Sequence, residues 1–547
     1  MSGGARAHHF FGSTAALAGL LALLCSGACR TSETATTTTT PKSELVVTAE
    51  PVPVAEPSGP PQMPAHAVIL DGFREARTQA QGRFLGRGRS PQPDLRELPK
   101  GPLPGAELSA DPLPGFFTPF DLPADETNPL ATFEAALDEL TAGTRTTPVR
   151  LAFFGASGLA ADLWTGYLRT YLQARFGDGG PGMVAPAPPV RWYRHHEFIV
   201  KSSSSKHWTK HNAYHLESEE DPGYFGVLGL AMSAKSKYAW AELAPQPGSK
   251  TARAIRHYDV FFLRQKRGGS FSIKVDGEVV KKVRTKLGKG EEAPHLGVVR
   301  VEVEPGEHVL RMRLTGDGVV RFLGVAAETG EAGIIVDTLG VDGARISNWS
   351  SWNDELWAEH LRQREPVLYA LHFGNNSAVD DDLSIPRYEE NYRGVLDRLR
   401  RVAPTASCVI LGPGDFPMVR EPEEPAEDAD KAKKAKKAKK AKKAKKAKKA
   451  EPGEEEPVVL VQRPLLNEIR EIQRSLAQEY GCAYWDMLKF DGGHGSKAAW
   501  AAAGLARSDY LHLSRDGYLR LGIAFADALM QRYDWRKGLD PSAAVEP

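Results

Sequence analysis

The stretch 149–162 constrains the fold more than any other part of this chain. Its first six residues, Val149–Phe154, are mostly apolar and predict a buried strand. Gly155-Ala156-Ser157-Gly158 follows, and apolar residues then recur at the spacing of an amphipathic helix: Trp164, Tyr167, Leu168, Tyr171, Leu172 and Phe176. In a parallel α/β sheet, such a strand end is where ligands bind. Ser157 therefore stands where a site is expected.

The alternation of strands and helices resumes after residue 330. Strands are predicted at 333–337, 367–373, 408–411 and 482–486, and helices at 388–401, 464–480 and 514–533. Strands that alternate with helices indicate a parallel sheet covered on both faces. We therefore expect a three-layer α/β/α fold of the flavodoxin-like type.

Residues 188–330 follow a different pattern. Apolar and polar residues alternate at 258–263, 270–275, 298–303 and 308–313, and glycine-containing turn signals separate these segments. Short alternating strands of this kind predict an antiparallel β-sandwich or jelly roll. We expect this module to be inserted into the α/β domain, dividing it into 126–187 and 331–540.

The amino terminus predicts export. Arg6 precedes the apolar run 15–24, which is too short to span a bilayer but suits a signal peptide over residues 1–29. Gly27-Ala28-Cys29 resembles the processing site of a bacterial lipoprotein, so we expect a lipid anchor at Cys29, with ordinary secretion as the alternative. Residues 30–125 are rich in threonine and proline and predict a disordered tether.

A lysine-rich segment interrupts the second part of the α/β domain at 421–456. Lys431–Ala450 repeats lysine and alanine without an apolar face, between two acidic runs. The pattern predicts a solvated loop, and the alternative is a basic arm that contacts an anionic envelope polymer or lipid surface. The formal net charge of only +1 gives no reason to expect specific binding of nucleic acid.

Cysteines and histidines give no sign of a metal or cofactor. Cys408 and Cys482 each begin a predicted strand, and both a disulfide and two buried thiols fit that position. Zinc-type cysteine spacings are absent from the sequence. His207, His211 and His215 recur every four residues without a pattern of carboxylate ligands, so we interpret them as surface residues.

Residues of types that are used in catalytic sites follow several of the predicted strands. Gly343 and Asn376 come after the strands at 333–337 and 367–373, at the same sheet edge as Ser157. Asp509 and His512 are three residues apart, which lets a carboxylate hold Nδ1 of the imidazole while Nε2 faces Ser157. Taken singly, each of these residues fits a helix cap, a turn or a buried polar group.

His494 lies in a glycine-rich loop and is a second candidate for the base. It has no acidic residue one turn before it. We therefore rank it below His512.

Ser157, Gly343, Asn376 and His512 follow one another in the same order as the sequence blocks of the SGNH (GDSL-like) hydrolase family, and the chain resembles that family. The resemblance covers about 128–187 and 331–535, and its blocks are Gly155-Ala156-Ser157, Gly343, Gly374-Asn375-Asn376 and Asp509-x-x-His512. Trp485-Asp486 and Gly492-Gly493-His494-Gly495-Ser496 are similar to bacterial envelope members that act on acetylated polysaccharides.

The resemblance implies an esterase without a cofactor, acting on acylated polysaccharide or a small ester. Ser157 would be the nucleophile, His512 the base and Asp509 the acid that orients it. The oxyanion would be held by the backbone N–H groups of Ser157 and Gly343 and by the amide of Asn376.

Two positions depart from the family. Ala156 stands where the family usually has Asp, and Gly158 where some members have His. Ala156 therefore leaves open a catalytically impaired protein that binds carbohydrate. A second alternative, independent of these two positions, is an O-acetyltransferase that uses the same triad with a sugar hydroxyl in place of water.

Overall fold

The computed structural model describes residues 118–123, 127–191, 193–213, 223–380, 382–419 and 460–538. The predicted signal peptide, the lipid anchor at Cys29 and the lysine-rich segment lie outside these residues, as does the predicted tether up to residue 117. The tether prediction is wrong for residues 118–123, because Phe120–Asp121 forms a strand that pairs with Tyr484 and Trp485 of the sheet. No helix in the described ranges is long and apolar enough to cross a membrane.

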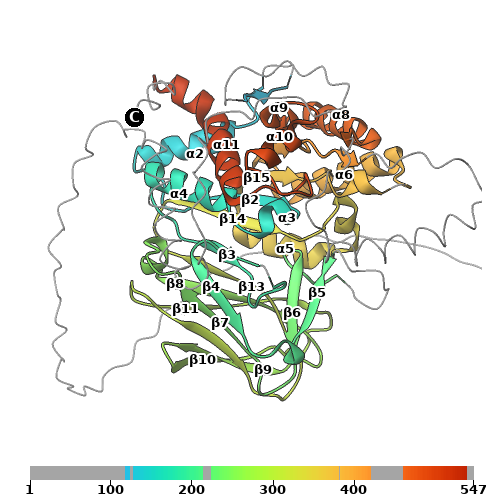
Figure 1. Cartoon of the computed structure of the whole chain (residues 1–547). Helices are drawn as coiled ribbons and strands as arrows, with labels where there is room; N and C mark the ends of the chain where they lie inside the picture. Colours follow the sequence, from blue (N-terminus) through green and yellow to red (C-terminus); the bar gives the residue numbers. More distant parts are fainter. Residues whose placement is uncertain are drawn as a thin grey trace, which may run out of the picture. The chain divides into compact units, whose positions relative to one another are not determined.

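A six-stranded sheet forms the centre of the α/β domain (Figure 1). Its outermost strand β1 is antiparallel to β19, and the other neighbours are parallel. In order across the sheet, the strands are β1 (Phe120–Asp121), β19 (Ala483–Trp485), β16 (Ser407–Leu411), β15 (Pro366–His372), β2 (Val149–Gly155) and β14 (Ile334–Gly340).

Helices cover both faces of this sheet, and each face has its own apolar core. On one face lie α2 (Ala131–Thr141), α3 (Ser157–Ala160), α4 (Trp164–Phe176), α9 (Met487–Asp491), α10 (Ser496–Ala502) and α11 (Arg515–Arg536). On the other lie η4 (Ile346–Ser351), α5 (Asp354–Arg364), η5 (Ser377–Val379), α6 (Ile385–Val402) and α8 (Pro464–Glu479). The predicted three-layer α/β/α fold is confirmed.

The inserted module consists of two antiparallel sheets. Five strands form one sheet in the order β10 (Glu278–Arg284), β9 (Ser270–Val275), β12 (Leu310–Leu314), β7 (Trp240–Pro245) and β4 (Phe198–Ser202). The other contains β11 (His295–Glu302), β8 (His257–Arg264), β13 (Val320–Glu328), β6 (Leu230–Ala234) and β5 (Thr209–Asn212), with β3 (Gly182–Val184) paired to β13.

An apolar core between the two sheets confirms the predicted sandwich. Phe271 of one sheet contacts Phe262 and Phe322 of the other, at ring-centroid distances of 5.6 and 4.9 Å. Short elements complete the described residues: η1 (Ser205–His207), η3 (Thr251–Arg253), β17 (Met418–Val419) and β18 (Leu460–Val461).

The module packs tightly on the α/β domain. The ring of Phe261 in β8 lies 4.2 Å from that of His360 in α5, and both domains contribute to one apolar core. The chain leaves and re-enters the α/β domain at neighbouring points, because Asp178 forms a β-bridge with Ile334. The module is therefore attached both by its ends and by a broad apolar contact.

A buried ionic network also crosses this junction. Glu328, the last residue of β13, accepts hydrogen bonds from Arg150 of β2 and Arg364 of α5. Burial alone would raise the pKa of Glu328, but the two arginines and His257 hold it well below its usual value. Glu328 is therefore a charged link between module and domain.

The two body cysteines form a disulfide. Cys408 lies in β16 and Cys482 immediately precedes β19, the neighbouring strand, and their Cα atoms are 4.7 Å apart. Of the two possibilities that the sequence left open, the structure has the disulfide.

Candidate active site

Ser157 begins α3 directly after β2, at the carboxyl edge of the sheet. The approach of the chain is tight here, because a Cβ at Gly155 would lie 2.5 Å from the Leu159 side chain and 2.8 Å from the His372 carbonyl oxygen. Glycine is thus required immediately before this turn. Ala156 is the N-cap of α3 and provides no side-chain hydrogen bond, as expected for alanine at this position.

The structure brings Ser157, His512 and Asp509 together. The Ser157 Oγ lies 3.0 Å from His512 Nε2, and His512 Nδ1 lies 2.9 Å from Asp509 Oδ2. The other carboxylate oxygen of Asp509 accepts the backbone N–H groups of Leu511 and His512. These contacts fix the imidazole between hydroxyl and carboxylate, which is the geometry of general-base activation.

Asp509 is ionised in this arrangement. Partial burial would raise the pKa of its carboxyl group, but the hydrogen bonds from His512 and Leu511 outweigh burial and lower that pKa. A charged carboxylate favours the tautomer of His512 with its proton on Nδ1, which leaves Nε2 free to accept the serine proton.

The predicted oxyanion donors are only partly assembled. Ser157 and Asn376 line one cavity, whereas Gly343 is not among its lining residues. The two loops nevertheless touch, because Asn376 Nδ2 donates to the carbonyl of Ala344 over 3.0 Å. Gly343 itself has φ +77°, a left-handed conformation that a side chain would strain.

The cavity beside the serine is small. Its volume is about 50 Å³, whereas pockets for drug-sized ligands measure about 300–1,000 Å³. It is lined by Ala156, Ser157, Gly158, His372, Phe373, Gly374, Asn375, Asn376, Met487, Leu511, His512, Leu513 and Tyr518. A short acyl group fits this space better than a fatty acyl chain.

His372 is a cavity residue that the sequence reasoning missed. It ends β15 and lies beside Gly158, where an added Cβ would be 3.5 Å from the His372 ring. Burial, with a smaller effect of Lys497, lowers the pKa of His372 to about 4, so the ring is neutral at physiological pH. The position of His372 two residues before Gly374-Asn375-Asn376 was the available signal.

Asp162 is a second residue that the sequence patterns did not identify. It lies just after α3 and stabilises the turn that carries Ser157. It has φ +47° and separates α3 from α4. Its buried carboxylate accepts hydrogen bonds from Arg169, Thr165, Thr338 and the backbone N–H of His196. One carboxylate thus joins the nucleophile turn to β14 and to the first segment of the module.

The other histidines are not part of this arrangement. His494 does not line the cavity. His207 and His211 lie within 3.2 and 2.7 Å of the hydroxyl groups of Ser203 and Ser233, while His215 falls outside the described residues. Within the described ranges, no group of three or more His, Cys, Asp or Glu side chains could hold a metal ion.

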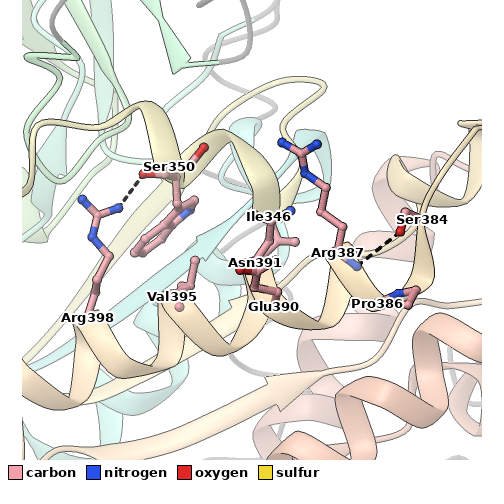
Figure 2. A pocket seen from close by; sticks show the side chains of 11 residues that line it. Ile346, Ser350, Ser384, Pro386, Arg387, Glu390, Asn391, Val395 and Arg398 are labelled. Atoms are coloured by element: carbon pink, nitrogen blue, oxygen red, sulfur yellow. Dashed lines mark hydrogen bonds between the residues drawn. The ribbon is translucent and has the colours of Figure 1, made fainter.

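A larger hollow of about 820 Å³ lies between η4 and α6 (Figure 2). Arg387, Glu390, Asn391 and Arg398 project into it from α6, and Ile346 and Ser350 from η4. None of the predicted catalytic residues lines this hollow. The chemistry therefore belongs to the smaller cavity.

Comparison with family models matches residues 316–520 to the GDSL-like Lipase/Acylhydrolase family. The match runs from just before β13 into α11, less than half of the chain, and over these residues the chain is similar to this family. Ser157 lies before the matched residues because the inserted module separates it from the rest of the hydrolase domain. The domain is that of a serine ester hydrolase, with an SGNH-type fold.

A solved structure with a TM-score above 0.5 supports the SGNH-type fold. A peptidoglycan O-acetylesterase is 21% identical, with a TM-score of 0.56 over 75% of this chain and 98% of that chain. An active-site mutant of a family two carbohydrate esterase from Clostridium thermocellum matches at 9% identity, covering 60% of this chain and 99% of that one, with a TM-score of only 0.21. Comparison with curated proteins finds no match.

Proposed function

We propose that this protein removes O-acetyl groups from an envelope or extracellular polysaccharide. The observation that carries the proposal is the serine–histidine–aspartate chain of contacts at 3.0 and 2.9 Å, opening on a cavity of about 50 Å³. The size of the cavity favours acetyl over longer acyl groups. The structural likeness to a peptidoglycan O-acetylesterase favours a polysaccharide as the alcohol part.

The mechanism follows from these contacts. The Ser157 hydroxyl attacks the acyl carbon, and His512 takes its proton and returns it to the departing sugar hydroxyl. The Ser157 N–H and the Asn376 amide hold the developing oxyanion, with Gly343 as the third donor if its loop moves toward the cavity. Water then repeats the sequence on the acyl-enzyme and releases acetate.

A fluorophosphonate probe and a series of p-nitrophenyl esters test the proposal. We expect the probe to label Ser157, and acetyl ester to be cleaved at least tenfold faster than octanoyl ester. Release of acetate from O-acetylated peptidoglycan would identify the polysaccharide. Acetyl transfer to added sugar instead of water would identify a transferase, and neither labelling nor turnover would leave a binding protein.

We infer further that the protein is exported and held at the cell envelope through Cys29. The support is the sequence of residues 1–29. We propose a solvated loop for the lysine-rich segment 421–456, with an electrostatic contact to an anionic polymer as the alternative. Incorporation of labelled palmitate into the wild type, and its loss in Cys29→Ser, tests the anchor. Palmitate-free, freely secreted wild-type protein would contradict it.

A further inference from the structure

The five-stranded sheet of the module turns one face toward the sandwich core and the other away from it. In β12, Leu310, Met312 and Leu314 are buried in that core. Because side chains alternate along a strand, Arg311 and Arg313 between them lie on the outer face. The strand register then identifies which residues of the neighbouring strands share this face.

Two cross-strand rows define the outer face. Arg313 lies opposite Ser272, which in turn faces Lys282 of the edge strand β10. Arg311 lies opposite Lys274 on one side and Glu242 on the other. We call the following residues the cationic face: Lys201, Lys274, Lys282, Arg284, Arg311 and Arg313.

The cationic face is poorly neutralised. Glu242 is the acid within these rows, and it accepts a hydrogen bond from Arg311 over 2.7 Å. Among the described residues, no carboxylate forms an ion pair with Lys201, Lys282, Arg284 or Arg313. The direct opposition of Arg311 and Lys274 is destabilising, since like charges on facing strands repel.

This segregation is unusual for a chain whose formal net charge is only +1. Protein surfaces normally mix both signs, and a field of a single sign serves to attract a partner of opposite charge. The Arg311 guanidinium lies 4.7 Å from the centre of the Trp240 ring on this face, which helps to hold it in place. Arginine and lysine side chains arrayed along a sheet face are charged donors for a row of carboxylates.

We propose that the cationic face binds a carboxylate-bearing glycan chain. The bound polymer would lie across strands β10, β9, β12 and β7, whose outer face points away from the α/β domain in Figure 1. The choice of a glycan as the polyanion rests on the proposed function. The charge pattern itself does not depend on catalysis.

Binding of the full-length protein to polygalacturonate, with dextran as the neutral control, tests this proposal. The test variant carries Lys274→Gln, Lys282→Gln and Arg313→Gln. The matched control carries Lys206→Gln, Lys235→Gln and Lys250→Gln, three exposed lysines outside the five strands. Both are made in a background whose lysines at 431–450 are glutamines, so that the repeat does not mask the difference.

We expect polygalacturonate binding at least tenfold weaker in the test variant, and within twofold of wild type in the control. Binding should weaken with added salt, because exposed charges are screened. Equal loss in both variants, or equal affinity for dextran, would overturn the proposal. Tighter binding to duplex DNA or anionic vesicles than to polygalacturonate would also overturn it. An unchanged thermal unfolding temperature of the test variant excludes misfolding as the cause of weaker binding. The Ser157→Ala variant should bind polygalacturonate like the wild type, which shows that binding by the cationic face does not depend on esterase activity.

Discussion

Ser157 and His512 are 355 residues apart in the chain, yet the hydroxyl of one lies 3.0 Å from Nε2 of the other. The contact requires the α/β domain to close across the whole inserted module. It also makes a direct prediction about catalysis.

Replacement of either partner should abolish ester hydrolysis. We expect Ser157→Ala and His512→Ala each to lower kcat/KM for p-nitrophenyl acetate by a factor of about 10³ or more, because the nucleophile loses its oxygen or its base. Ser350→Ala is the matched control, since Ser350 lies in the separate hollow of Figure 2. Full activity of Ser157→Ala would remove the catalytic assignment altogether.

Removal of the Asn376 amide should slow the chemical step without preventing it. We expect Asn376→Ala to lower kcat by about 10²–10³, the usual effect of losing one oxyanion donor, with a much smaller change in KM. Asn391→Ala on α6 should leave both constants unchanged. A variant with altered KM and normal kcat would mean that Asn376 binds substrate rather than the oxyanion.

The size of the cavity should set the preference for acyl chain length. Met487 lines the cavity, and Met487→Ala enlarges it. We expect the ratio of butyryl to acetyl ester hydrolysis to rise about tenfold, a typical effect of a small change in pocket volume. Met418→Ala, at an exposed position of β17, provides the comparison. An unchanged ratio would place the acyl group elsewhere.

The junction between module and domain should be sensitive to acid. Glu328 has a lowered pKa, so it stabilises the fold fully above its unfolded value near 4.5 and loses that contribution as the pH falls through its folded value. We expect Glu328→Gln to lower the free energy of unfolding by about 3 kcal/mol at pH 7, because buried arginines lose a charged partner.

The difference between wild type and Glu328→Gln should shrink as the pH drops below about 4.5, as urea unfolding at several pH values can measure. Glu331→Gln provides the control, since that side chain is 69% exposed and pairs only loosely with Arg256. A difference that is independent of pH would mean that charge at residue 328 is unimportant.

The sequence patterns predicted the layers of the fold because each layer has a local signature. Period-two alternation marked β8, β9, β11 and β12, and helical spacing marked α4, α6, α8 and α11. Strands β3, β4, β5, β6, β7, β10 and β13 of the module were not predicted, and among them β3 and β13 are almost wholly buried and show no period-two pattern.

The sequence predicts the position of a site residue only where the order of strands in the sheet determines that position. Ser157 and Asn376 share a cavity because both follow parallel strands at one edge. Gly343 also follows such a strand but does not line the cavity, since the exact course of a turn depends on its packing. Asp162 holds partners distant in sequence, such as Thr338, and His372 is buried among residues of other segments, which no local pattern reveals.

The β-bridge between Asp178 and Ile334 holds the two ends of the inserted module next to each other. Because the insertion starts and ends at adjacent points, a short loop in its place would leave the parallel sheet unbroken. Excision would nevertheless remove Phe261 and so expose the apolar residues of α5 that pack on the module, and it would remove Glu328 from Arg150 and Arg364. The chain connections would therefore allow the module to be removed, but the newly exposed apolar and charged groups would destabilise the domain. A stable shortened enzyme would need polar substitutions on the uncovered surface as well as a new loop.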